Sequence, residues 1–421
     1  MRKKAFDICH SFTFYLFPPI LTQNCEPLNQ GNMNEIKIAI IGGGVIGCAV
    51  ARELSREYDD IFLFEKNPGI TQGENQSSRN SGVIHSGIYY DQETRPNKAK
   101  FCVEGNRLLY EFCEQHKVPF IKTGKIIVAI DEKEEEILQL YLERADINHV
   151  TGVTLINGLK VRELEPNVRA HSALLVPSTG IVDPSSLVYR LHTLAYQSGV
   201  TFMTGTKVIG LEGHGDEIDL SIQNKDGSKE QVRARAVINA AGVEADRMAR
   251  LLNPESSYEL DPVRGESYKF YSHKRPGLEL KGWNVYPTPE VVITPEGRHF
   301  TVGVHLTPTF DDFAYPSKPG TTFTVGPKLF PVQDRDNWQK DYSPPGIFFE
   351  KVSPFFPELR EQDLIWHQAG LQARLKGKPD FIILNDKNTS CFINLLGLDS
   401  PGLTSSLAIG KKVAEKIRSI L

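Results

Sequence analysis

The chain has 421 residues, which makes two domains the natural expectation. Hydrophobic residues make up 40% and charged residues 24% of the total, the balance of an ordinary globular protein. A net charge of −4 argues against a strongly basic surface, so we expect no nucleic-acid partner. None of the six cysteines belongs to a CxxC pair, which favours reduced, packed thiols and no metal site.

The beginning of the chain differs from the rest. Its apolar run, Phe12 to Leu21, is interrupted by Pro18-Pro19, resembles a poor signal peptide and is too short to span a bilayer. Met33 stands just before the first predicted strand, so we expect residues 1–34 to be a disordered tail or an extension from an upstream start codon. No later apolar run reaches about 18 residues. We therefore expect a cytoplasmic protein with at most peripheral contact with the inner membrane.

A strand–turn–helix pattern opens the main part of the chain. Lys37–Ile41 is a β-branched run typical of a buried parallel strand, and the helix predicted from Val45 follows it directly. Between them Gly42 permits a tight turn, Gly44 lets the backbone approach a pyrophosphate, and Gly47 lets the helix pack on the strand. The N–H groups at the helix start then face the phosphates. The predicted dinucleotide contacts here are Gly42, Gly44, Val45, Ile46 and Gly47.

A second strand over residues 61–64 ends at Glu65, which lies 18 residues after Gly47. An acid at this position is expected to bind ribose hydroxyls, and it would repel the 2′-phosphate of NADP. The order of strand, glycines, helix, strand and acid predicts a dinucleotide site. By itself this order does not separate NAD from FAD.

The later elements follow in chain order. A polar segment beginning near Ser77 contains Arg79, Asn80 and Ser81, which can donate to phosphate, and then places His85 between two glycines. Helices are predicted over 98–116, 132–150, 185–197, 244–252 and 405–421, and strands over 125–130, 200–211, 237–241 and 391–396. Residues 261–354 are rich in β pattern, Pro and Gly, without a clear helix, which predicts an antiparallel sheet covering a substrate.

At these residues the chain resembles the FAD-dependent oxidoreductases of the D-amino-acid oxidase superfamily, and within it the L-2-hydroxyglutarate dehydrogenases. The resemblance runs from about Glu35 to the C-terminus. The stretches that carry it are SSRNSGVIHSGIYY (77–90), PSTGIVD (177–183), NAAGVEADR (239–247), PVRGE (262–266), GVHLT (303–307) and SPGLTSSLAI (400–409).

The resemblance implies an α/β (α+β) fold, with a Rossmann-like FAD-binding domain built from discontinuous segments and a β-rich antiparallel substrate domain. We place the FAD domain at 35–112, 178–255 and 360–421, and the substrate domain at 113–177 and 256–359. The implied reaction is oxidation of an L-2-hydroxy acid, above all L-2-hydroxyglutarate to 2-oxoglutarate. A hydride passes to the flavin, and the electrons pass on to a quinone or another acceptor.

The resemblance also assigns positions around FAD. Arg79 and Ser81, with Asn80 between them, would lie by the phosphates and the ribityl chain. Val208 would lie near the adenine. Ala241 and Gly242 would lie by the pyrophosphate, and the turn of Gly402, Leu403 and Thr404 would lie by the flavin ring.

Two departures from the family pattern concern the substrate. Where such families show an arginine after Gly-Val or Gly-Ile, this chain has Gln372, and the next arginine is Arg374. Positions two apart share one face of a strand, so we expect Arg374 to reach the pocket in its place. Residues 291–299 resemble an insertion before the GVHLT stretch.

The reaction needs a base for the hydroxyl proton and cations for the carboxylates. His85 and His305 are the candidate bases, because imidazole titrates near neutral pH. Arg264 and Arg374 are the candidate carboxylate ligands, because a guanidinium can bind a carboxylate through two hydrogen bonds. For Tyr89 and Tyr268 we favour a packed aromatic role over a hydroxyl contact.

Two other functions fit the same pattern. One is a flavin amine or amino-acid oxidase, or a glycerol-3-phosphate dehydrogenase, on the same fold, since fold alone does not fix the substrate. The other is a non-catalytic, flavin-binding assembly protein.

Overall fold

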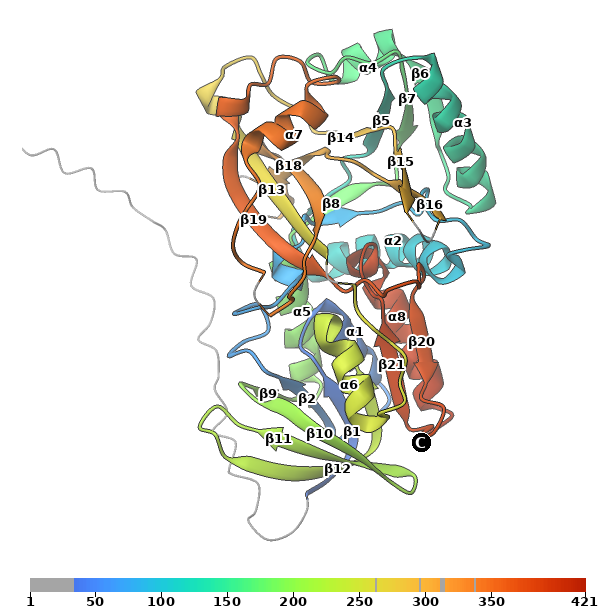
Figure 1. Cartoon of the computed structure of the whole chain (residues 1–421), viewed down its shortest axis with the longest axis vertical. Helices are drawn as coiled ribbons and strands as arrows, with labels where there is room; N and C mark the ends of the chain where they lie inside the picture. Colours follow the sequence, from blue (N-terminus) through green and yellow to red (C-terminus); the bar gives the residue numbers. More distant parts are fainter. Residues whose placement is uncertain (1–33, 262, 295–296, 311–314, 337) are drawn as a thin grey trace, which may run out of the picture.

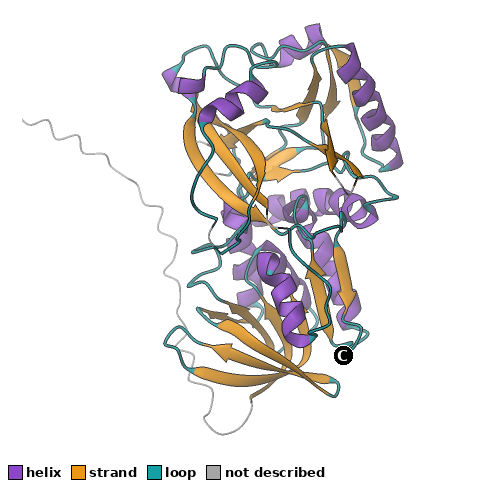
Figure 2. Ribbon diagram, viewed as in Figure 1, coloured by secondary structure: helices purple, strands orange, loops and turns teal. Residues whose placement is uncertain are grey.

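A computed structural model describes residues 34–261, 263–294, 297–310, 315–336 and 338–421 (Figure 1). Our expectation for the first 33 residues lies outside this part of the chain. Two large sheets occupy opposite halves of the molecule, and helix α2 (Pro96–His116) runs between them (Figures 1 and 2).

The first sheet has a parallel core flanked by antiparallel strands. Five strands lie side by side in parallel: β9, β2, β1, β12 and β21. Strand β11 pairs antiparallel with β12, β10 pairs antiparallel with β11, and β20 pairs antiparallel with β21. Its strands are β1 (Asn34–Ile41), β2 (Ile61–Glu65), β9 (Thr201–Thr204), β10 (Lys207–His214), β11 (Glu217–Gln223), β12 (Lys229–Asn239), β20 (Ile382–Asn385) and β21 (Phe392–Leu396).

Apolar side chains cover both faces of this sheet, as a parallel sheet requires. On β1, Ile38 and Ile40 pack toward helices, whereas Ala39 and Ile41 belong to the core on the other face. The helices of the first face are α1 (Val45–Leu54), α2, α5 (Pro184–Gln197) and α8 (Gly402–Ile417). On the other face, α6 (Ala245–Leu252) contributes Met248 beside apolar side chains of β10 and β11.

The second sheet runs in the order β19-β13-β18-β17-β14-β5-β7-β6 and is antiparallel except for the pair β14–β5. Helix α7 (Pro345–Val352) packs on one face and α3 (Glu132–Ile147) on the other. Its strands are β5 (Lys125–Ala129), β6 (Thr154–Asn157), β7 (Ser172–Val176), β13 (Val263–Tyr271), β14 (Asn284–Pro287), β17 (Leu306–Phe310), β18 (Pro319–Pro331) and β19 (Ile365–Gln372).

Smaller elements join the two halves. A three-stranded sheet orders β3 (Val83–Ile84), β8 (Gly180–Val182) and β4 (Phe120–Ile121), and the polar segment forms a short 3-10 helix, Ser77–Arg79. Helix α4 (Gly158–Leu164) follows β6. The hairpin of β15 (Glu290–Thr294) and β16 (Gly297–Thr301) occupies the stretch that resembles an insertion.

The expected fold class is confirmed, with three local corrections. Helix α7 lies in a region for which no helix was expected, because Pro344-Pro345 reads as a break, yet a proline suits the first helical turn. The short helix α4 was also missed. Strand β19 pairs with β13 in the second sheet, although we placed residues from 360 onward in the FAD domain.

Three chemical features of the described residues bear on function. None of the helices there is long and apolar enough to cross a membrane. The same part of the chain contains no group of three His, Cys, Asp or Glu side chains placed to hold a metal ion. Cys48, Cys102, Cys113 and Cys391 are free and buried, and burial is the first cause that raises the thiol pKa of each.

Candidate active site

The glycine turn between β1 and α1 is fixed by close backbone approaches. Gly42 has φ +106°, and a Cβ there would lie 2.5 Å from the carbonyl oxygen of Ala240. A Cβ on Gly47 would lie 1.9 Å from the carbonyl oxygen of Gly42. Gly44 is different, because its nearest neighbour would be the Ser77 hydroxyl at 3.2 Å. The turn therefore requires glycine at 42 and 47 for packing, and glycine at 44 leaves backbone accessible to a phosphate.

Glu65 closes the turn at the end of β2. Its carboxylate is buried and accepts hydrogen bonds from the backbone N–H of Gly43 and of Asn67, both at 2.7 Å. The N–H of Thr206 donates to the Glu65 carbonyl at 2.9 Å, which holds the start of β10 against this strand end. Val208 is buried two residues farther along β10. The expected ribose and adenine residues thus lie on neighbouring segments.

The polar segment joins the turn to the second sheet. The Ser77 hydroxyl accepts from the N–H of Val45, the first residue of α1, at 2.9 Å. Arg79 donates to the Ala369 carbonyl of β19 at 3.3 Å, and its guanidinium lies over the ring of Trp338. The Asn80 side chain accepts from the N–H of Gly82, and Ser81 is half-buried.

Two further turns complete this edge. Gly242 follows β12 with φ +56°, and a Cβ there would meet no described atom within 4 Å, so the turn is open. Gly402, Leu403 and Thr404 begin α8 after β21, and the Thr404 hydroxyl accepts from the His85 N–H at 3.0 Å. The carboxyl ends of parallel neighbours meet at one edge, so the structure brings together all four expected turns, those after β2, β1, β12 and β21. These residues fit a dinucleotide.

A cluster of buried polar side chains lies where the two halves meet. Its members come from five places. They are His85 and Tyr89 in the segment after β3, Cys102 on helix α2, Lys125 on β5, Tyr286 on β14 and His305 in the turn before β17. Several of their polar atoms have no hydrogen-bond partner among the described residues, which is uncommon in a folded protein and makes this cluster a candidate ligand site. The unpartnered atoms include Nδ1 of His85, the Tyr89 hydroxyl, Nζ of Lys125 and Nε2 of His305.

His305 is the better defined of the two candidate bases. Its Nδ1 lies 3.1 Å from the Gly303 carbonyl, which can only accept, so Nδ1 carries the proton and Nε2 has a free lone pair. The His305 pKa is lowered to about 3: burial is the main cause and the nearby Lys125 contributes, while the hydrogen bond to Gly303 acts in the opposite direction. The ring stacks on Tyr286, with centroids 3.7 Å apart. This imidazole is therefore neutral and rigidly held.

His85 lies across the cluster from β17. Burial lowers its pKa well below the usual value, and Lys125 and His305 add to the shift. Its Nε2 lies 3.4 Å from the Ser400 hydroxyl in the turn before α8. The carbonyl of His85 accepts from Asn106 of α2 at 2.9 Å. His85 thus links the turn before α8 to α2.

The two candidate arginines are held by other protein groups. Arg264 is buried, pairs with Glu266 at 2.5 Å, and donates to the carbonyls of Trp338, Lys340 and Asp341. This arrangement anchors the loop of residues 338–341.

Arg374 lies two residues beyond the end of β19, so the strand alternation that we used to place it does not apply. Its side chain is 40% exposed and lies 3.8 Å from Asp399. Tyr268 donates to the Ser343 carbonyl and packs on Trp366, as expected for a packed aromatic.

Lys125 is a charged residue of the cluster that the sequence did not indicate. It begins the apolar strand KIIVA and is fully buried, on the same face as Ile127. A lysine at a strand end usually reaches solvent, so residue type alone does not predict that this one is buried. The available signal was a charge at an alternating core position of an otherwise apolar strand.

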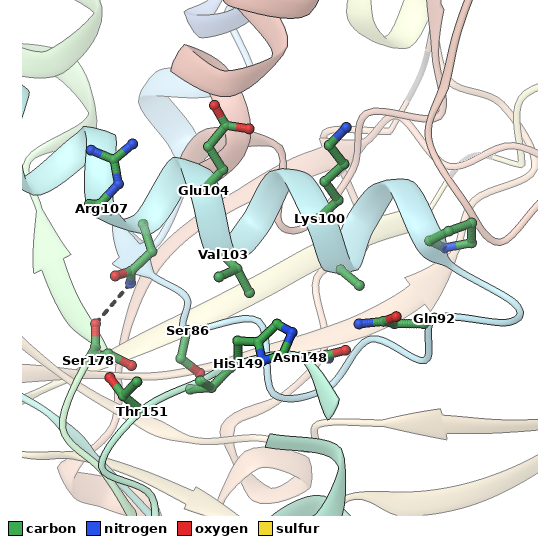
Figure 3. Close-up of a pocket in the computed structure, with 14 residues that line it drawn as sticks. Ser86, Gln92, Lys100, Val103, Glu104, Arg107, Asn148, His149, Thr151 and Ser178 are labelled. Atoms are coloured by element: carbon green, nitrogen blue, oxygen red, sulfur yellow. Dashed lines mark hydrogen bonds between the residues drawn. The ribbon is translucent and has the colours of Figure 1, made fainter. Parts of the chain in front are cut away.

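A cavity of about 800 Å³ lies beside this cluster, between α2 and the turn after α3 (Figure 3). Val103, Ser86 and His149 line it, and Asn106, whose bond to the Ser178 carbonyl is drawn, joins its wall to the His85 segment. Neither candidate base lines it, so we do not assign the substrate to this cavity.

Comparison with known proteins identifies the class to which this fold and site belong. Residues 37–416 match the family model described as FAD dependent oxidoreductase. The chain therefore belongs to the FAD-dependent oxidoreductase family, it is an enzyme of that class, and its cofactor is FAD. The resemblance stated above is confirmed.

Within this family, the chain is similar to L-2-hydroxyglutarate dehydrogenases over nearly its whole length. The chain is 30% identical to the mitochondrial L-2-hydroxyglutarate dehydrogenase of Caenorhabditis elegans, over an alignment of 438 positions with gaps included. The alignment covers 96% of this chain and 97% of the relative. It is 29% identical to the L-2-hydroxyglutarate dehydrogenase of Indibacter alkaliphilus, and the match covers 90% of this chain and 98% of the relative.

Among solved structures, the FAD-bound L-alpha-glycerophosphate oxidase of Mycoplasma pneumoniae matches with a TM-score of 0.78. It is 26% identical, with 92% of this chain and 95% of that chain covered. Glycine oxidase of Geobacillus kaustophilus matches with a TM-score of 0.72 at 19% identity, which shows the fold alone.

Proposed function

We propose that this enzyme oxidises an L-2-hydroxy acid, and that its substrate is L-2-hydroxyglutarate, with 2-oxoglutarate as product. The observation that most supports this proposal is the similarity to L-2-hydroxyglutarate dehydrogenases over nearly the whole length of both chains. A quinone or another small acceptor would reoxidise the enzyme.

Oxidation of the alcohol removes the C2 hydrogen with two electrons, and it removes the hydroxyl proton. Bound FAD supplies the acceptor for the two electrons. Nε2 of His305 suits the proton, because it is buried, unprotonated and without a partner among the described residues. We assign His305 as the base and His85 as the second candidate, held beside the start of α8.

The residues at the strand edge would hold FAD as the resemblance implies. Glu65 would accept from ribose hydroxyls, and the turns at Gly42–Gly47 and Ala241–Gly242 would bind the pyrophosphate. Arg79, Asn80 and Ser81 would lie along the phosphates and ribityl chain, and the turn of Gly402, Leu403 and Thr404 beside the flavin ring. Val208 would face the adenine.

Glycerol phosphate oxidation is the second candidate. It is favoured by the 26% identity to the Mycoplasma pneumoniae glycerophosphate oxidase structure, at a TM-score of 0.78. Both substrates are secondary alcohols with an anionic group, so the same base and cofactor would serve either one.

Turnover with an artificial electron acceptor distinguishes the candidates. The holoenzyme is assayed with both enantiomers of 2-hydroxyglutarate, with L-lactate, with glycerol 3-phosphate and with glycine, and 2-oxoglutarate is quantified directly. We expect the highest kcat/KM for L-2-hydroxyglutarate, with one 2-oxoglutarate formed per acceptor reduced by two electrons. A higher kcat/KM for glycerol 3-phosphate or glycine would contradict the proposed substrate and identify that compound as the better one.

A further inference from the structure

Lys125 is a buried amine with no anion beside it among the described residues. Its side chain is fully buried at the start of β5, and Nζ has no hydrogen-bond partner among the described residues. A buried charge is costly unless it is paired, so an uncompensated lysine calls for a reason beyond packing.

Two tyrosine rings enclose the ammonium group. Nζ lies 3.9 Å from the ring centroid of Tyr286 and 4.7 Å from that of Tyr89. The imidazole of His305 stacks on Tyr286 at 3.7 Å, so it occupies one face of that ring and Nζ must lie on the other. Ring faces attract a cation, but they leave its net charge in place.

The ionisable groups around Lys125 are all uncharged near neutral pH. His85 after β3 and His305 before β17 have pKa values lowered by burial first. Burial raises the pKa values of Cys102 on α2 and of the two tyrosines, Tyr89 and Tyr286. None of these groups is a carboxylate, so none can neutralise the ammonium.

The other cations singled out for the substrate are already engaged. Arg264 pairs with Glu266 and three carbonyls, and Arg374 lies beside Asp399 with much of its side chain in solvent. Lys125 is therefore the cation of this cluster that still lacks an anion.

We propose that Lys125 supplies the positive charge that balances a carboxylate of the bound substrate, and that it takes up a proton when a dicarboxylate binds. This inference rests on the proposed function and adds the residue that selects for an anion. Lys125 acts from behind Tyr89 and Tyr286 and need not contact the substrate, so we class it as a positioning residue.

The pH dependence follows from linkage. Burial lowers the Lys125 pKa to about 7 in the enzyme without substrate. A carboxylate bound nearby favours the charged form and raises this pKa, so above pH 7 binding must be accompanied by proton uptake. Affinity for the diacid then falls by about tenfold per pH unit above the free pKa.

Calorimetry with glutarate tests this directly, because glutarate is a diacid without the 2-hydroxyl group and is not oxidised. It is titrated into the oxidised holoenzyme at pH 8 in phosphate and in Tris, whose protonation enthalpies differ. We expect uptake of about one proton per glutarate bound. This measurement needs no variant.

Variants then test whether Lys125 is the group that takes up the proton when glutarate binds. Lys125→Met and Lys125→Gln should bind glutarate about 10–100-fold more weakly at pH 7, with no proton uptake and no pH dependence. Lys122→Met, which removes an exposed lysine three residues away, should behave as wild type. FAD content and melting temperature report on folding.

The outcomes separate the two proposals. Wild-type binding without proton uptake, or variants at Lys125 that bind and take up protons normally, would overturn the role of Lys125 and leave the hydroxy-acid function standing. Failure of the wild-type holoenzyme to bind glutarate or 2-oxoglutarate would contradict the proposed function, and the inference with it.

Discussion

His305 owes its proposed role to two local features that an exposed histidine lacks. The Gly303 carbonyl fixes the tautomer, and burial holds the pKa at about 3. Because the folded-state pKa is lowered, the ring stays neutral and Nε2 stays unprotonated at every pH above that value. The same low pKa makes the imidazole a weak base, so the proposed role depends on the buried, free lone pair and not on basicity.

This leads to a prediction for the variant and for the wild-type pH profile. His305→Asn should lower kcat by about 10²–10⁴-fold with unchanged FAD content, because the proton acceptor is lost. His273→Asn, at an exposed position, is the matched control. In wild type, kcat should show no fall that reports a histidine titrating near pH 6.5. A normal kcat for His305→Asn would transfer the role of base to His85.

Two glycines of the turn should have different roles: Gly47 is needed for folding, and Gly44 for binding FAD. Gly47→Ala places a Cβ 1.9 Å from a backbone oxygen, so we expect a loss of about 3 kcal/mol in the free energy of unfolding together with loss of FAD. Gly44→Ala meets only the Ser77 hydroxyl at 3.2 Å, so the apoprotein should fold while FAD binding weakens.

Retention of FAD on a desalting column and the melting temperature measure the two effects. Gly213→Ala, at an exposed position of β10 where a Cβ makes ordinary contacts, should change neither quantity. Identical behaviour of the alanine variants at 44 and 47 would mean that the close approach at Gly47 relaxes freely.

At the scale of the elements, an ion pair fastens α2 to the turn before α8. Nζ of Lys98 lies 2.6 Å from Asp399, and the two side chains are only 9% and 7% exposed. The carbonyl of Asp399 also accepts from the N–H of Gly402, the first residue of α8. The pair therefore holds the turn that we assign to the flavin ring.

Breaking this pair should destabilise the enzyme and loosen its cofactor. Lys98→Met leaves the Asp399 carboxylate nearly buried, with Arg374 at 3.8 Å as its remaining partner, so we expect a loss of about 3 kcal/mol in the free energy of unfolding. FAD should dissociate faster on dilution. Lys100→Met on the same helix, an exposed position, should have no effect. Equal melting temperatures for the two variants would rule out this role for the pair.

Elements could be predicted where the residues that define them lie close together in the sequence. The glycine turn, Glu65 and the strands around them lie within one short stretch, so spacing alone placed them. Helix α7 was missed because its first turn contains proline, and local pattern does not distinguish a helix start from a break there. Residues from 360 onward were placed in the FAD domain, and the pairing of β19 with β13 was not expected because the two strands are distant in the chain.

At the scale of the whole molecule, the two sheets bring together side chains that no local pattern connects. Lys125, Tyr286 and His305 meet only because β5 pairs with β14 and the turn before β17 folds over it. Arg264 was a reasonable carboxylate ligand from residue type, but the loop at 338–341 takes its donors. The turns at the carboxyl edge of the first sheet could thus be predicted from sequence, whereas the burial of Lys125 and the engagement of Arg264 required the tertiary structure.

In the proposed reaction, FAD bound at the carboxyl edge of the first sheet is reduced by an L-2-hydroxy diacid. Anaerobic titration of the holoenzyme tests it most directly, with the oxidised-flavin absorbance as the signal. Stoichiometric L-2-hydroxyglutarate should bleach the flavin, and the D enantiomer, glycine and glycerol 3-phosphate should leave it oxidised. A flavin that stays oxidised with L-2-hydroxyglutarate, but is bleached by glycerol 3-phosphate or an amino acid, would contradict the account.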